Sequence, residues 1–147
     1  MINRDDRDKA ASILRKFIDC EITNDEFSKL FPRSREDKAV WAIRLQVWTH
    51  YSDFSEHRLS GKNRPSTDIL AMLERCWAFL LSNCEYRWPE PSFGLKGILQ
   101  NLLDKLPQFK RTSGTGSVSQ VGDENMWPFF SKEEYERFAN MKDGHPS

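Results

Sequence analysis

The sequence predicts an all-α fold, a compact irregular bundle of about five to six helices with one long Gly/Ser-rich loop near the C-terminus. Three observations predict it. Apolar residues recur at helical spacing along the chain, residues that cap helix N-termini precede several of these segments, and prolines follow them. The length of 147 residues fits one helical domain over 1–147, which buries enough surface to fold without disulfides or metals.

Two helices are predicted in the first part of the chain. Residues 5–19 place their apolar side chains on one face, as an amphipathic helix does. A shorter helix follows within 22–32. Thr23 and Glu26 have the spacing of a capping box at its start, and Pro32 ends it.

The next two helices are expected to form the centre of the core. One begins at Ser34 and runs to about Phe54 or His57, because apolar residues surround most of its circumference. After the loop LSGKNRPS, residues 66–86 carry the clearest apolar stripe in the chain. This second helix is predicted to be the middle of the bundle.

The C-terminal part of the chain alternates helices with breaks. A stripe of leucines predicts a helix over 95–106, and Pro107 stops it. Residues 112–125 are rich in Gly and Ser, and this composition indicates a flexible surface loop. A last helix is expected at about 132–141, and residues 142–147 are expected to fray.

The run WPFF at residues 127–130 has two interpretations, a clasp that ties the tail to the body or an exposed docking element. Ser131 and Glu134 have capping-box spacing, so the run leads into the last helix. Burying one large aromatic side chain contributes about 1.5–3 kcal/mol, which is enough to hold a helix that is marginal alone. The clasp is favoured, and a second Trp-Pro pair at 88–89 supports an architectural role.

Charge composition disfavours nucleic acid as a partner. Lys and Arg number 22 and are matched by 22 Asp and Glu, so the chain lacks the basic field of a general nucleic-acid binder. Two small basic clusters leave a nucleic-acid accessory factor as an alternative, although a solvated surface explains them better. The clusters are Arg58, Lys62 and Arg64, and Lys105, Lys110 and Arg111.

The cysteines indicate a reducing compartment. Cys20, Cys76 and Cys84 are odd in number and form no C-x-x-C pair, so a disulfide scaffold or structural zinc site is not expected. Cys76 lies on the apolar face of the 66–86 helix and is read as a core residue. The chain has no signal-peptide core and no apolar run of about 20 residues, so we expect a cytoplasmic protein with no membrane contact.

One cluster, HYSDFSEHR, carries candidate metal chemistry. On a continuous helix His50, Asp53 and His57 share one stripe, where two imidazoles and a carboxylate can bind a divalent metal. This predicts a metal-dependent hydrolase with Glu56 as base, as an alternative function. A plain helix terminus, with His57 and Arg58 complementing its dipole, explains the same residues and is favoured. Otherwise no cofactor is expected, and no phosphate-binding loop or nucleophile elbow is present.

A resemblance adds one expectation. The run YSDFSEHRLSGKNRPS, an apolar helix, the element NCEYRWPEP and the WPFF segment near the C-terminus together resemble a group of small bacterial proteins without a known activity. The resemblance covers about half of the chain. It implies a bacterial accessory protein and adds no catalytic residue.

The function that the sequence favours is therefore a non-enzymatic protein-binding or accessory domain of an immunity-like, antitoxin-like or regulatory kind. Specific catalytic motifs are absent from the sequence, charge is balanced, and aromatic residues are plentiful. Exposed Trp residues are effective interface anchors, so Trp88, Trp127 and Phe129 are the predicted partner-binding residues. The sequence indicates neither the partner nor an oligomeric state.

Overall fold

The regular structure is entirely helical in the part of the chain that the computed structural model describes, residues 1–51, 54–88 and 122–143. These ranges contain no strand, so the all-α prediction is confirmed for them. The α-helices are α1 (Arg4–Ile18), α2 (Asn24–Leu30), α3 (Lys38–Trp48), α4 (Thr67–Leu81) and α6 (Lys132–Asp143), and two short 3-10 helices are η1 (Gly61–Asn63) and η3 (Glu124–Met126). The predicted helix at 95–106 and loop residues 112–121 lie outside the described ranges.

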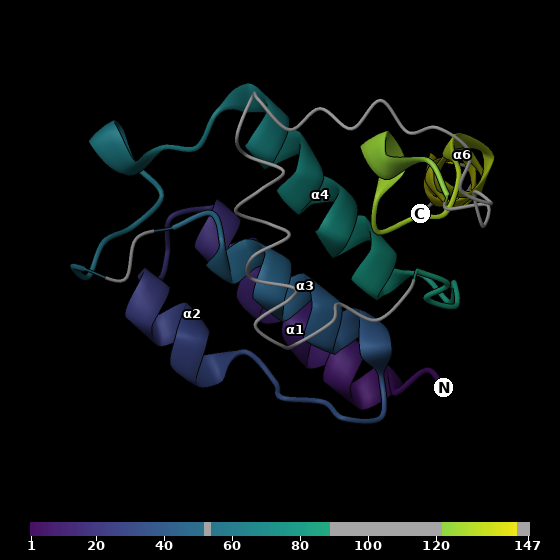
Figure 1. The fold of residues 1–147 in the computed structure, drawn as a ribbon, viewed down its shortest axis with the longest axis horizontal. Helices are drawn as coiled ribbons and strands as arrows, with labels where there is room; N and C mark the ends of the chain where they lie inside the picture. The colour runs from purple at the N-terminus through teal and green to yellow at the C-terminus, as the bar shows by residue number, and fades with distance from the viewer. Residues whose placement is uncertain (52–53, 89–121, 144–147) are drawn as a thin grey trace, which may run out of the picture.

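The centre of the bundle is the contact between α1 and α4. Figure 1 shows α1, α3 and α4 packed together, with α2 at one end and α6 at the other. Each central helix buries the apolar face that its sequence predicts. Helix α4 buries Leu73, Cys76, Phe79 and Leu80, which confirms it as part of the core.

Helix α2 begins at the predicted capping box. The Thr23 hydroxyl accepts the Glu26 backbone N–H at 3.3 Å, and the Glu26 carboxylate accepts the Thr23 N–H at 2.9 Å. The buried Asn24 ties this helix start to the segment after α3. Its backbone N–H donates to the His57 carbonyl at 2.9 Å, and its side-chain oxygen accepts the His57 N–H at 2.8 Å.

Helix α3 is shorter than the sequence predicts at both ends. The prediction that it starts at Ser34 is wrong, because Asp37 is the N-cap and accepts the Ala39 N–H at 3.0 Å. Ser34 instead accepts the Asp37 N–H at 3.2 Å in the turn before the helix. The prediction that α3 reaches Phe54 or His57 is also wrong, because it ends at Trp48, where the Thr49 hydroxyl donates to the Gln46 carbonyl at 2.7 Å.

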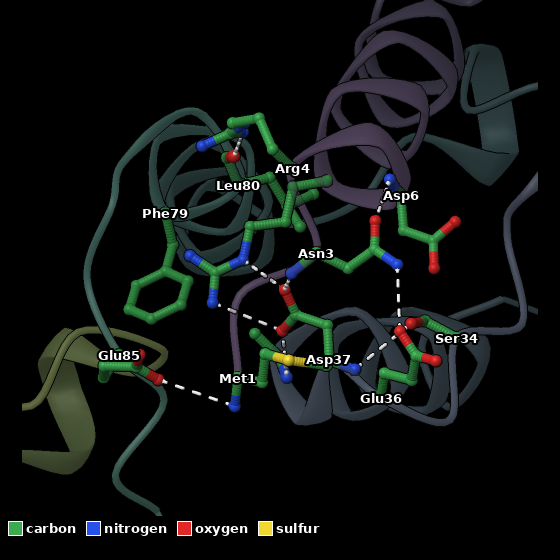
Figure 2. A network of polar contacts seen from close by, with 12 residues as sticks. Met1, Asn3, Arg4, Asp6, Ser34, Glu36, Asp37, Phe79, Leu80 and Glu85 are labelled. Carbon is green, nitrogen blue, oxygen red and sulfur yellow. Dashed lines mark hydrogen bonds and ion pairs between the residues drawn. The ribbon is translucent and has the colours of Figure 1, made fainter.

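A buried ion pair joins the start of α1 to the start of α3. Arg7 Nε lies 2.7 Å from Asp37 Oδ2 and Arg7 Nη2 lies 3.2 Å from Oδ1, while each side chain is only 1% exposed. Asp37 also accepts the Asn3 backbone N–H at 3.0 Å, and Figure 2 shows Asn3, Asp37 and Ser34 in this network. The carboxylate is thus fully hydrogen-bonded, as a buried charge requires.

The same arginine also holds the end of α4. Arg7 Nη1 donates to the carbonyls of Ser82 and Cys84 at 3.2 and 2.8 Å, and its Cζ lies 5.2 Å from the centre of the Phe79 ring. Arg4 donates to the carbonyls of Ser82 and Leu80. Carbonyls at a helix C-terminus have no partner within the helix. Arg4 therefore satisfies the Leu80 carbonyl in the last turn of α4, and Arg4 and Arg7 together bind the carbonyls just after the helix.

We predict that breaking the buried pair destabilises the fold more than replacing it. Arg7→Met or Asp37→Leu leaves one charge buried without its partner, so each is expected to lower the free energy of unfolding by about 3–5 kcal/mol. The double variant removes both charges and is expected to be more stable than either single variant. Urea denaturation followed by circular dichroism measures all three.

Lys132→Met, which removes an exposed pair with Glu136, is the control and should change the free energy of unfolding far less. A double variant as unstable as the sum of the two single variants would show that Arg7 and Asp37 do not act as a pair.

We also predict that the three thiols react at different rates. Cys76 is fully buried, and burial raises the pKa of its thiol, whereas Cys20 and Cys84 are half-buried. Because the thiolate is the reactive form, iodoacetamide should label Cys20 and Cys84 in the native protein and Cys76 only in denaturant. Peptide mass spectrometry locates the label. Native labelling of Cys76 at the rate of Cys84 would contradict the packing of α4.

Candidate functional site

Trp88 is fixed against the C-terminal segment. It lies in the segment that follows α4, and its indole Nε1 donates to the carbonyls of Pro128 and Phe129 at 3.1 and 3.3 Å. Its ring lies 5.7 Å from the ring of Phe130, centre to centre. The side chain is half-buried, so part of the ring is held in place while part is exposed.

Trp127 is fixed from two sides in a similar way. Its Nε1 donates to the hydroxyl of Tyr86 at 3.2 Å, and its carbonyl accepts Nε of Arg75, from α4, also at 3.2 Å. Burial raises the pKa of the Tyr86 hydroxyl, so this group stays protonated and available as a hydrogen-bond partner. Trp127 is half-buried like Trp88.

Phe129, the third predicted partner-binding residue, is a core residue in the structure. It is fully buried, and its ring centre lies 5.1 Å from that of Phe79 and 5.2 Å from that of Tyr135. The interpretation of WPFF as a clasp is therefore confirmed, because the segment anchors the last helix to α4. Both tryptophans sit at the edge of this anchor.

The start of α6 shows the predicted caps in a modified form. The Ser131 hydroxyl accepts the Glu134 N–H at 3.2 Å, as in a capping box. In a capping box the Glu134 carboxylate would accept the N–H of Ser131, but here it accepts the N–H of Phe130 at 2.7 Å. Glu134 also lies 3.1 Å from Arg87, whose guanidinium stacks 4.4 Å from the centre of the Phe130 ring.

Gly122 lies in close contact with the clasp. The N–H of Asp123 donates to the Phe130 carbonyl at 2.9 Å. A Cβ atom added at Gly122 would lie 2.4 Å from that same carbonyl oxygen and 2.8 Å from an atom of the Phe130 ring. Only glycine therefore fits at this position.

A hollow of about 320 Å³ lies where α3, α4 and the two tryptophan segments meet. It brings together Trp88 and Trp127, which are 39 residues apart in sequence but share one cavity wall. Its volume is at the lower end of the range of about 300–1,000 Å³ that is typical of ligand pockets. The lining residues are Gln46, Met72, Arg75, Trp88, Glu124 and Trp127.

Four of these lining residues were not predicted from the sequence. Gln46, Met72, Arg75 and Glu124 come from three separate segments, and no local motif links them. Arg75 gives the one usable signal, because it is the single basic residue within α4. That signal marks a charged position on a mostly apolar helix and does not reveal which residues lie opposite.

The predicted metal ligands do not share a helical stripe, because α3 ends before His50. His50 is exposed, and its Nε2 lies 3.2 Å from Nε2 of Gln46. His57 lies in the segment that contacts α2, with Nδ1 2.9 Å from the Ser55 carbonyl. The interpretation of His57 and Arg58 as a helix terminus is wrong for the same reason.

Asp53 lies outside the described residues, so the predicted set of three ligands stays a prediction. Among the residues that the structure describes, no group of three or more His, Cys, Asp or Glu side chains is placed to hold a metal ion. The first basic cluster, Arg58, Lys62 and Arg64, is exposed around η1. The second cluster also lies outside the described part of the chain.

A second, apolar groove of about 450 Å³ runs between the end of α4 and α6, lined by residues such as Leu81 and Phe138.

None of the described helices is both long and apolar enough to span a bilayer. Comparisons with protein-family models, curated proteins and solved structures find no match. The resemblance to small bacterial proteins stays a prediction.

We predict that Gly122→Ala loosens the clasp. The added methyl group collides with backbone, so the free energy of unfolding should fall by about 1–3 kcal/mol, and tryptophan fluorescence should change as Trp88 and Trp127 shift. Gly61→Ala is the comparison, because Gly61 has a φ of +56° but open space around its Cβ position. It should cost about 1–2 kcal/mol through its backbone conformation alone and leave the fluorescence unchanged. Fluorescence that responds equally to both variants would contradict the role of Gly122.

Proposed function

We propose that this chain is a non-enzymatic protein-binding domain that holds a segment of a partner protein in the hollow between Trp88 and Trp127. The observation that carries the proposal is the convergence of two half-buried tryptophans on one cavity. Trp is the residue type most enriched among the side chains that dominate binding energy at protein interfaces, together with Tyr and Arg. The hollow offers two indoles and one arginine.

The rings are held before any partner binds. Each indole N–H is already bonded within the chain, to Tyr86 or to the carbonyls of the clasp. A partner therefore meets ring surfaces of fixed orientation, and little side-chain entropy is lost on binding. Preorganisation of this kind supports recognition.

The lining chemistry supports binding more than catalysis. Among the described residues that line it, the hollow has one carboxylate, from Glu124, and no Ser, Cys, Lys or His side chain that would act as a nucleophile. Its remaining groups are an amide, a thioether, a guanidinium and two indoles. These are groups that position and hold a ligand.

The place of action is part of the same proposal. The three cysteines form no disulfide, which fits a reducing compartment and hence the bacterial cytoplasm. The zero formal net charge fits a specific protein partner better than nucleic acid. We propose an accessory role of the immunity-like, antitoxin-like or regulatory kind.

Site-specific photocrosslinking tests the proposed surface. Replacing Glu124, which is exposed at the rim of the hollow, with p-benzoylphenylalanine should give a crosslink to a partner protein in a lysate of the source organism. The same replacement at Lys62, which is exposed on η1 and does not line the hollow, is the matched control and should not give that product.

Competition makes the result specific. Excess wild-type protein and excess Trp48→Ala protein should both suppress the crosslink, because Trp48 is 52% exposed but does not line the hollow. Excess Trp88→Ala protein, shown to be folded by circular dichroism, should not suppress it. Equal crosslinking from positions 62 and 124, or no crosslink from 124, would refute the proposed function.

A further inference from the structure

We propose that the hollow selects an acidic segment of its partner, with a carboxylate placed on Arg75 and a neighbouring apolar side chain placed against Trp88 and Trp127. This inference rests on the proposed function and names the chemistry that the hollow recognises. It begins with the guanidinium of Arg75, because that group is the only positive charge among the lining residues that the structure describes.

Arg75 is held in place but only partly used. Its Nε donates to the carbonyl of Trp127 at 3.2 Å, which fixes the guanidinium beside the indole. Its terminal nitrogens, Nη1 and Nη2, make no hydrogen bond or ion pair with the part of the chain that the structure describes. Two adjacent N–H donors of fixed geometry match the two oxygens of a carboxylate.

This arrangement separates Arg75 from the other arginines of the described chain that are buried or half-buried. Each of those four donates through a terminal nitrogen to a carbonyl or carboxylate of the protein itself. They are Arg4, Arg7, Arg15 and Arg44. Arg75 alone in this set keeps its terminal donors for another molecule.

The apolar residues that line the hollow indicate which chemical group the ligand carries beside its carboxylate. Two indoles and the thioether of Met72 surround the guanidinium, so the ligand that fills the hollow carries an aliphatic or aromatic group beside its charge. The indole N–H groups are already bonded, so only the ring surfaces of Trp88 and Trp127 remain for contact. An acidic residue next to an apolar residue in a peptide has this composition.

Glu124 raises the opposite possibility, a cationic ligand placed on the indoles, since aromatic rings attract cations. Glu124 makes no ion pair with Arg75, although both line the hollow. Its side chain is exposed and its charge is screened by water, whereas Arg75 is half-buried and anchored. A cation that entered the hollow would also meet the unpaired guanidinium, so the acidic ligand is favoured.

Selection from a peptide library tests this chemistry. The intact protein is immobilised and exposed to a combinatorial library of acetylated hexapeptide amides, and the retained peptides are sequenced. Peptides that place Asp or Glu beside an apolar residue should be enriched. In tryptophan-fluorescence titrations, the Gln or Asn analogue of the best peptide should bind about tenfold more weakly or worse, the scale expected for a lost charge-assisted hydrogen bond.

Variants assign the effect to Arg75. Arg75→Gln should bind the acidic peptide about tenfold more weakly than wild type does. This loss should match the loss that wild type shows when the peptide's Asp or Glu is replaced by Asn or Gln. Arg64→Gln, an exposed arginine outside the hollow, is the matched control and should bind like wild type. Glu124→Gln should bind the acidic peptide as tightly as wild type or more tightly.

The result that would overturn the inference is distinct from failure of the proposed function. Enrichment of Lys or Arg peptides, loss of binding in Glu124→Gln, or a library without any acidic preference would refute the acidic ligand. If position 124 still crosslinks to a partner, the proposed function stands with a ligand of other chemistry. If position 124 gives no crosslink, the proposed function fails as well.

Discussion

The arrangement of the described helices depends on one interaction, the buried ion pair between Arg7 and Asp37. The pair is almost fully shielded from water, and its remaining donors and acceptors bond to Asn3, Ala39 and the carbonyls of Ser82 and Cys84. Asp37 is at once the partner of Arg7 and the N-cap of α3. Arg7 also binds carbonyls after α4, so a single side chain fixes the start of α1, the start of α3 and the end of α4 relative to one another.

This network positions part of the candidate binding site. Because Arg7 holds the carbonyls of Ser82 and Cys84, the direction in which the chain leaves α4 is set. That direction delivers Trp88 to the clasp, where its indole bonds to the backbone of the C-terminal segment. The hollow is thus linked to α1 through the contacts of Arg7 with the segment after α4 and of Trp88 with the clasp. Partly buried hydrogen bonds hold its two tryptophans and Arg75 in place.

Sequence reasoning succeeded where one local pattern decides the structure. The apolar stripes of α1 and α4 and the capping box of Thr23 and Glu26 are of this kind. It failed at α3, because a hydrophobic pattern that continues past Trp48 does not reveal that the Thr49 side chain closes the helix. Arg7 lies in a highly charged segment whose composition predicts an exposed side chain. Its burial is possible only because it pairs with Asp37. The hollow could not be predicted from the sequence either, because residues from separate segments form its walls.

The clasp has a topological consequence. Trp88 and Gly122 are 34 residues apart in sequence, and both lie against Phe130, one through ring packing and the other through a close backbone approach. Two points of the chain that are distant in sequence therefore meet at the same residue. Closing a stretch between fixed points costs entropy that grows only with the logarithm of its length. The contacts that both points make with Phe130 therefore close a long-range connection at an entropic cost that depends only weakly on their separation along the chain.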